Sequence, residues 1–232
     1  MNEIIRKRKS IRKYDQAKLG ESALDKVRAQ IAVLKPLYPE IPYSVEIADK
    51  AKGVFGVTAP HYLVFRSQEQ DGHFENIGFV GQQMDLFFSA SGIGACWLGM
   101  AKPEDKNAAA LPIVILMAFG TPAEPLHREL SEFKRKTLAE MSEGDDTRLE
   151  AARLAPSARN AQNWFFTAED GKIRCYRKTL SPVTGMIMNK FPQIDMGIAL
   201  CHIAEESESF TFGKESGVPD RKGYVYAGTV GA

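Results

Sequence analysis

The sequence predicts a mixed α/β or α+β layered fold made of two related lobes. The chain has 232 residues, of which 44% are apolar and 25% charged, so it can bury a sizeable core. Apolar segments of strand length alternate along it with segments of helical periodicity, as in layered α and β structure. A short pattern also recurs. Asn76–Val80 and Asp195–Ala199 each have a polar residue followed two positions later by a glycine, and each segment opens a predicted helix. An apolar strand that ends in Gly-Thr follows in each half. The recurrence indicates two lobes about a pseudo-two-fold axis.

The first half of the chain is predicted to contain two helices and three strands. We expect an extended opening at 10–14 and then a helix from Ser22, with Leu24, Val27, Ile31 and Leu34 on one face. Pro36, Pro39 and Pro42 break this helix and hold the next stretch extended. A strand at 61–65, a helix at 76–91 and strands at 95–99 and 113–119 follow. The helix at 76–91 is apolar on nearly all sides, which indicates a buried helix. The strand at 113–119 is continuously apolar, as in a sheet covered on both faces, and Gly120-Thr121-Pro122 ends it.

A polar, charged stretch at 125–146 is the best candidate for a linker between the two halves. After it we expect a short helix capped by Thr147 and ended by Pro156, a hairpin of 163–167 and 172–177 around Asp170-Gly171, a helix at 194–206 and a strand at 223–230. We therefore divide the chain into a first lobe at 1–144 and a second lobe at 145–232, which form one intertwined unit.

Composition excludes several classes of function. Lysine and arginine number 30 against 29 acidic residues, and a net charge of +1 gives no surface field for nucleic acid. No run of about eighteen apolar residues exists to span a membrane, and the N-terminus lacks the apolar stretch of a signal peptide. Three widely separated cysteines, without zinc-ligand spacing, are typical of buried thiols in a cytosolic protein. We expect a cytoplasmic protein with no nucleic-acid or membrane partner.

The basic N-terminal segment is a candidate anion site. Arg8, Ser10 and Arg12 alternate, so in an extended chain they point to one side. Two guanidinium groups and a hydroxyl can hold a phosphate through charge-assisted hydrogen bonds. A solvated basic terminus or a nucleic-acid patch would have the same composition, and composition alone favours that simpler interpretation.

Two further segments can approach a ligand. In Pro156-Ser157-Ala158-Arg159-Asn160, turn-forming residues after a helix can present polar groups to a planar heterocycle, although a capping loop explains them somewhat better. Glycines in Gly92–Gly99 permit close backbone approach, although tight packing again suffices. The four histidines are scattered, and no hydrolase, P-loop or zinc-protease motif occurs. A reaction carried by a bound cofactor therefore suits the sequence best.

Together these segments resemble one family, the FMN-dependent nitroreductases. Residues 8–14 resemble its opening R-x-S-x-R-x-Y/F, and residues 151–164 are similar to its A-A-R-x-A-P-S-x-x-N-x-Q-P-W, with Asn163 in place of the proline. Residues 92–99 resemble its G-x-G-x-x-W-x-G, residues 113–122 its late strand, and residues 135–140 the basic segment that follows it.

One departure from the family pattern is informative. The P-S-x-x-N motif normally follows the first helix closely, but here residues 34–39 hold no such motif and it occurs near residue 155. The chain thus resembles single-chain, two-lobed members of the family, in which one chain imitates the usual homodimer. The resemblance implies a monomer acting as a pseudo-dimer, or a weak homodimer, with one complete FMN site.

The resemblance also implies roles for individual residues. Arg8, Ser10 and Arg12 would hold the phosphate and ribityl end of FMN, and replacing Arg8 by alanine should leave the fold intact. Pro156, Ser157 and Asn160 would line the flavin from the other lobe. The backbone at Gly94 and Ala95 would approach the ring. Arg135, with Lys134 as the second choice, would place positive charge near the pyrimidine edge or the phosphate.

The implied function is an NAD(P)H oxidoreductase, in which NADH or NADPH reduces FMN and a small-molecule oxidant such as a nitroaromatic or quinone reoxidises it. No side chain need act as a nucleophile. The alternatives are a non-catalytic flavin-binding or sensory protein, or another flavin reaction on this fold, such as reductive dehalogenation or flavin breakdown.

Overall fold

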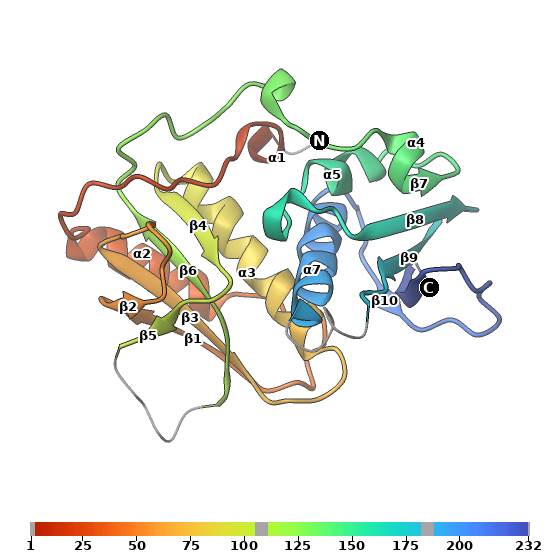
Figure 1. The fold of residues 1–232 in the computed structure, drawn as a ribbon, viewed down its shortest axis with the longest axis horizontal. Coiled ribbons are helices and arrows are strands. Elements are labelled where there is room, and N and C mark those ends of the chain that lie inside the picture. The colour runs from red at the N-terminus through yellow and green to blue at the C-terminus, as the bar shows by residue number, and fades with distance from the viewer. Residues whose placement is uncertain (1–2, 105–110, 182–187, 232) are drawn as a thin grey trace.

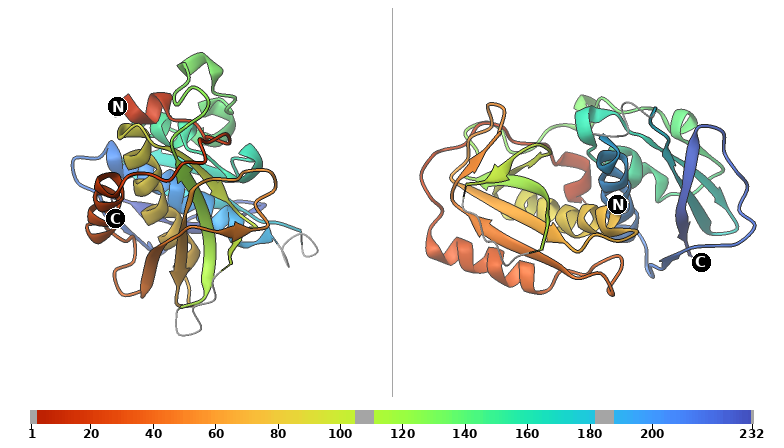
Figure 2. Two further views of the ribbon diagram at one scale, coloured as in Figure 1. Left: turned by 90° about the vertical axis from the view of Figure 1, so that its left-hand side faces the viewer. Right: turned by 60° about the horizontal axis from the view of Figure 1, so that its bottom comes forward.

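Two mainly antiparallel sheets stand on either side of a central pair of helices (Figure 1). The computed structural model describes residues 3–104, 111–181 and 188–231. Both long central helices, α3 and α7, run between the sheets, and the two views in Figure 2 keep them at the middle of the molecule. The mixed α+β class predicted from the sequence is confirmed.

The first sheet and its helices come from the first half of the chain. The elements are α1 (Glu3–Lys7), α2 (Glu21–Ala32), β1 (Tyr43–Ala48), β2 (Ala51–Lys52), β3 (His61–Ser67), α3 (His73–Ala90), β4 (Gly94–Leu98), β5 (Lys102–Pro103) and β6 (Ile113–Gly120). Strands β2 and β5 form a separate two-stranded ribbon.

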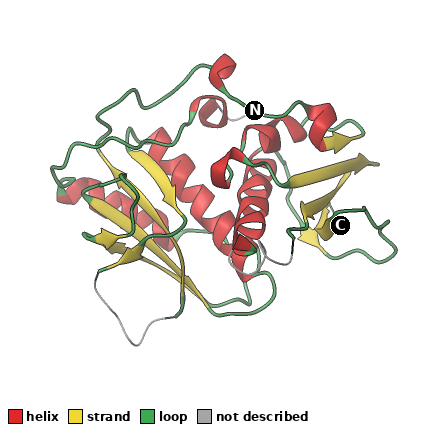
Figure 3. Cartoon of the chain, in the orientation of Figure 1, coloured by secondary structure: helices red, strands yellow, loops and turns green. Residues whose placement is uncertain are grey.

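The second half repeats the pattern after a long crossing segment. Its elements are η1 (Leu130–Glu132), α4 (Leu138–Met141), β7 (Ser142–Glu143), α5 (Leu149–Leu154), η2 (Ala158–Asn160), β8 (Trp164–Glu169), β9 (Lys172–Lys178), α7 (Lys190–Glu205), β10 (Phe212–Gly213) and β11 (Tyr224–Val230). Figure 3 shows that the crossing segment between the sheets is mostly loop.

Both sheets have the same strand order. The first runs β1-β3-β6-β4 and the second β8-β9-β11-β10, with every neighbouring pair antiparallel. The helices lie at equivalent places in the two halves. Helix α2 precedes β1 as α5 precedes β8, and α3 follows β3 as α7 follows β9. A short β7 is added parallel to β8 at the edge of the second sheet. The recurrence in the sequence therefore reflects a repeated fold. The division at residue 144/145 stays a prediction, and β7 lies just before it.

Two glycines bring α3 and α7 into backbone contact. An added Cβ on Gly78 would lie 2.1 Å from the carbonyl oxygen of Ile194, and one on Gly197 would lie 2.0 Å from that of Glu75. Each glycine thus packs on the residue three places before the other glycine. Reciprocity of this kind is the mark of a two-fold contact. Both helices are almost entirely buried.

The predicted helices and strands are present, with boundaries moved by a few residues. The helix expected at 76–91 begins three residues earlier, and the one expected at 194–206 begins at Lys190. The stretch at 125–146 contains η1, α4 and β7 within its loops. Thr147 does not cap α5. Instead, Asp146 accepts a hydrogen bond from the backbone N–H of Arg148, so the carboxylate one residue earlier holds this turn.

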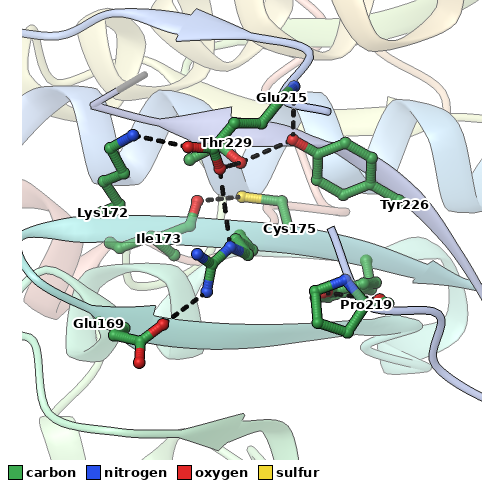
Figure 4. A network of polar contacts seen from close by, with 10 residues as sticks. Glu169, Lys172, Ile173, Cys175, Glu215, Pro219, Tyr226 and Thr229 are labelled. Atoms are coloured by element: carbon green, nitrogen blue, oxygen red, sulfur yellow. Dashed lines mark hydrogen bonds and ion pairs between the residues drawn. The ribbon is translucent and has the colours of Figure 1, made fainter. Parts of the chain in front are cut away.

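Polar contacts fix the last loop of the chain to the second sheet (Figure 4). Glu215 pairs with Lys172 at 2.6 Å and accepts a hydrogen bond from the Thr229 hydroxyl at 3.2 Å. Thr229 in turn bonds to the Tyr226 hydroxyl at 2.6 Å. This network lies on β9 and β11, and it braces the sheet behind α7.

The glycine contact predicts a severe effect of a single methyl group. Alanine in a helix interior normally stabilises by about 1 kcal/mol relative to glycine. At Gly78 or Gly197 it would meet a backbone carbonyl, so Gly78→Ala and Gly197→Ala should each lower the free energy of unfolding by about 1–3 kcal/mol. Chemical denaturation measures this. Gly20→Ala is the control, because an added Cβ there meets nothing within 4 Å. Wild-type stability in both helix variants would contradict the close contact.

Candidate functional site

Two adjoining cavities lie where the N-terminal segment, β4 and the loop after α5 meet. One, of about 360 Å³, has walls from Trp97, Pro156, Phe191, Ile194 and Ile198 among others, and we call it the apolar cavity. The other, of about 570 Å³, contains Arg8, Arg12, Arg128, Lys134 and Arg135, and we call it the basic cavity. Both are lined by Ser10, Arg12, Pro156, Ser157 and Arg159. Residues of both halves of the chain therefore build one continuous site.

The N-terminal segment is held in place by hydrogen bonds to β4 and to the crossing segment after β6. The N–H of Ile11 donates to the carbonyl of Ala95 at 2.8 Å, and Arg8 forms a β-bridge with His127. Glu124 accepts hydrogen bonds from the N–H groups of Arg12 and Lys13, at 2.7 and 3.2 Å. These bonds hold the pKa of the Glu124 carboxyl below its usual value, so it remains ionised.

Arg8 is a buried member of an ion pair. Only 1% of it is exposed, and its Nε lies 2.8 Å from Oδ2 of Asp85 on α3. Its Nη2 donates to the Ser10 hydroxyl at 3.3 Å. Both Arg8 and Arg12 line the basic cavity, but Arg8 is buried, whereas Arg12 is exposed and donates from Nη1 to the carbonyl of Ser10 at 3.5 Å.

A buried polar chain continues from Asp85 into α7. Gln82 donates from Nε2 to Oδ2 of Asp85 at 2.9 Å and lies 3.0 Å from Nε2 of His202. His202 contacts the carbonyl of Ala151 through Nδ1 at 2.9 Å. Burial lowers the pKa of His202 to about 3, so its ring is neutral, with Nδ1–H donating to Ala151 and Nε2 accepting from Gln82. The chain links the N-terminal segment to both central helices.

The basic cavity holds more positive charge than its own acids balance. Burial and the nearby Arg8 lower the pKa of Arg128 to about 10, while burial and then Arg128 lower that of Arg135 to about 9. Arg128 lies with its guanidinium carbon 3.7 Å from the centroid of the Phe133 ring. Arg135 donates to the Asn160 side-chain oxygen and to the carbonyl of Leu154. A bound anion would relieve this mutual repulsion, and a phosphate suits paired guanidinium groups.

The loop after α5 carries backbone strain. Arg159, Asn160 and Gln162 have φ of 54°, 57° and 48°, a conformation that side chains other than glycine rarely adopt. Several bonds hold it there. The Ser157 hydroxyl accepts from the N–H of Gln162 at 2.9 Å, and the Gln162 carbonyl and side-chain oxygens accept from Lys136. Such strain concentrates at ligand-binding segments.

One carboxyl lies among the apolar walls. Asp195 is 2% exposed, and its Oδ1 accepts a hydrogen bond from the N–H of Ala158 at 2.9 Å. Its Oδ2 has no hydrogen-bond partner in the described part of the chain. Burial raises the pKa of Asp195 to about 7. Sequence reasoning noted this residue as part of the recurring pattern but gave it no role.

The structure brings most of the predicted residues together. Arg8, Ser10, Arg12, Lys134, Arg135, Pro156, Ser157 and Asn160 all line the basic cavity. Gly94 and Ala95 line neither cavity, because Ile11 lies against them: an added Cβ on Gly94 would be 2.8 Å from its side chain. Cys96, Trp97 and Gly99, further along the same segment, reach the apolar cavity instead. The sequence did not indicate Arg128 as a cavity residue, because it lies in the charged stretch at 125–146 predicted to be a linker.

The family model described as "Putative TM nitroreductase" matches residues 1–207. The chain belongs to this family. The family assignment agrees with the resemblance identified from residues 8–14 and 151–164. No curated protein matches the chain.

A solved structure of the nitroreductase family has a similar fold. A putative nitroreductase from Thermotoga maritima is 20% identical, with a TM-score of 0.66 over 98% of this chain and 90% of that one. An FMN-dependent nitroreductase from Clostridium difficile is 17% identical, with a TM-score of 0.45 over 58% of this chain and 95% of that one. Among the described residues, no helix combines the length and apolar character that a membrane span needs.

The buried position of Arg8 changes one expectation from the sequence. Arg8→Ala should disturb the fold, because it leaves Asp85 in the core without its counter-ion. It should lower the free energy of unfolding of the apo-protein by about 3–5 kcal/mol. Arg12→Ala, at an exposed position, should change it by less than about 0.5 kcal/mol. Urea denaturation compares them, and Arg8→Ala with Asp85→Asn should recover part of the loss. Equal stability of the two single variants would refute the buried pair.

Proposed function

We propose that this protein is an FMN-dependent oxidoreductase that takes hydride from NADH or NADPH and reduces a small acceptor such as a nitroaromatic or a quinone. The observation that carries the proposal is the joining of an apolar cavity to a basic one, between the N-terminal segment and the loop after α5. A flavin mononucleotide has the same division, with a flat, largely apolar ring at one end and a phosphate at the other.

The residues present fit this cofactor. Arg12, Arg128 and Arg135 supply the positive charge that a phosphate needs, and Ser10 supplies a hydroxyl. Trp97, Pro156, Phe191 and their neighbours form walls for a planar ring. No dinucleotide fingerprint occurs in the sequence, which favours FMN over a larger adenine-containing flavin.

Chemistry at this site would come from the cofactor, with the protein controlling its surroundings. When bound, FMN supplies reversible hydride and electron transfer. Arg135 and Arg128 stabilise negative charge in the basic cavity, and a cation near a reduced ring favours the reduced state. The strained loop, held by Gln162 and Lys136, keeps Pro156 and Ser157 against the ligand. The apolar walls exclude water from the reacting face.

The repeated fold supports a single-chain imitation of a homodimer with one complete site. In the first lobe, Asn76 bonds to both the N–H and the carbonyl of Tyr38, at 3.0 and 3.4 Å, as Asp195 bonds to Ala158 in the second. The ring of Tyr38 packs edge-on against Phe212, with centroids 6.2 Å apart. The side chains of Tyr38 and Phe212 thus meet at the related position, and the family's P-S-x-x-N motif is missing from it.

Titration of the apo-protein with FMN tests the function. We expect one FMN per chain, bound by a particle whose mass in light scattering is that of a monomer, and steady oxidation of NADH or NADPH once a quinone is added. FAD should not replace FMN in the native protein. Two equivalent sites per chain would contradict the single-site proposal. Binding without turnover would favour a non-catalytic flavin protein.

The exposed Arg12 gives a test that does not disturb the fold. A hydrogen bond to a charged group contributes about 1.5–3 kcal/mol, so Arg12→Ala should weaken FMN binding by about one to two decades. Riboflavin, which lacks the phosphate, should lose much less. Flavin fluorescence gives both dissociation constants. Lys18→Ala, at an exposed cation outside both cavities, is the matched control. An unchanged FMN affinity in Arg12→Ala would mean that Arg12 belongs to a solvated basic terminus and does not bind the phosphate.

A further inference from the structure

Asp195 and its counterpart in the first lobe, Asn76, differ in how many of their polar side-chain atoms form hydrogen bonds. Asn76 occupies the equivalent place in the repeated pattern and uses both of its polar side-chain atoms on the loop at Tyr38. Asp195 uses Oδ1 alone, on Ala158, and its Oδ2 has no partner among the described residues although only 2% of the residue is exposed. A buried polar atom without a hydrogen bond is costly, so a partner from outside the chain is expected.

The place of Asp195 indicates which ligand supplies that partner. The residue lines the apolar cavity beside Pro156, Phe191 and Ile194, where the flavin ring would lie. We propose that Asp195 binds the ring in its neutral acid form, with Oδ1 accepting from Ala158 and Oδ2–H donating to an acceptor atom of the ring, so that ring binding takes up one proton. This inference rests on the proposed flavin function.

No charged group among the described residues shifts the pKa of Asp195 appreciably. Its raised pKa, of about 7, comes from burial, and the hydrogen bond from Ala158 is the counteracting influence. The other titratable groups of the apolar cavity are Arg12, Cys96 and Arg159. Elements packed against α7 contribute Glu75 and Asp85 from α3, Arg177 from β9, and Glu150 and Arg153 from α5. Each of these groups has an ionic partner: Asp85 pairs with Arg8, Glu150 with Arg153, and Glu75 with Arg177. Glu75 and Arg177 lie 3.7 Å apart.

Ring binding shifts this equilibrium in a defined direction. A ring that fills the cavity removes the remaining water from Asp195, which disfavours the carboxylate and raises the pKa further. Because the bound pKa exceeds the free value, affinity is full below about pH 7 and falls above it, towards tenfold per pH unit. Asparagine in place of Asp195 keeps the acceptor for Ala158, supplies a permanent N–H donor and removes the titration.

Riboflavin is the probe, because it carries the ring without a phosphate that itself titrates near pH 6. We would measure its dissociation constant from pH 5.5 to 9, and its proton uptake by calorimetry in two buffers of different ionisation enthalpy. The proteins are wild type, Asp195→Asn and Glu75→Gln, each checked for folding by thermal unfolding. Glu75→Gln is the control for a second buried carboxyl at the same helix contact. FMN is run in parallel, since its phosphate titrates equally in every variant.

Wild type and Glu75→Gln should lose affinity above pH 7 and take up close to one proton per riboflavin at pH 8, whereas Asp195→Asn should show neither effect. The same pH profile in Asp195→Asn and wild type would overturn the inference and leave the flavin function standing. Affinity that rises with pH would overturn it in favour of a carboxylate that accepts from a ring N–H. If neither FMN nor riboflavin binds wild type at any pH, the proposed function itself fails.

Discussion

The contact between α3 and α7 is the constraint on which the rest of the molecule depends. Gly78 and Gly197 let each helix press its backbone against the other, and the contact is reciprocal. Each helix also supports its own sheet, so the distance between the helices sets the distance between the two halves of the site. Side chains could not hold this distance as closely, because rotamers give way while a backbone carbonyl does not.

The helix pair also positions the N-terminal segment of the candidate site. Arg8 reaches Asp85 on α3, and Gln82 relays the contact to His202 on α7. The N-terminal segment is therefore tied to both halves through groups that never meet solvent. Buried polar networks of this kind are costly when a member is lost, and they specify one arrangement when complete. The cavities lie above this network, with cations from one side and the strained loop from the other.

The two halves of the fold have diverged at the positions that face ligands. Asn76 and Asp195 are equivalent in the repeated pattern. Asn76 bonds through both of its polar side-chain atoms, whereas Oδ2 of Asp195 has no partner among the described residues. The loop at Tyr38 is packed against Phe212, whereas the loop at Ser157 borders both cavities. The repeated scaffold thus carries different loops and different side chains at the two positions.

The sequence by itself determined the element types, the repeated pattern and the family motifs, because periodicity, turn residues and motif spacing are local properties. Through the family motifs it indicated Arg12 and Ser157 as candidate site residues. Only the tertiary structure decided that Arg8 is buried, that Ile11 lies against Gly94, and that Asp195 lies in an apolar wall. Burial and partner choice arise from residues far apart in the chain, so the same arginine or aspartate has no fixed role until the fold places its neighbours.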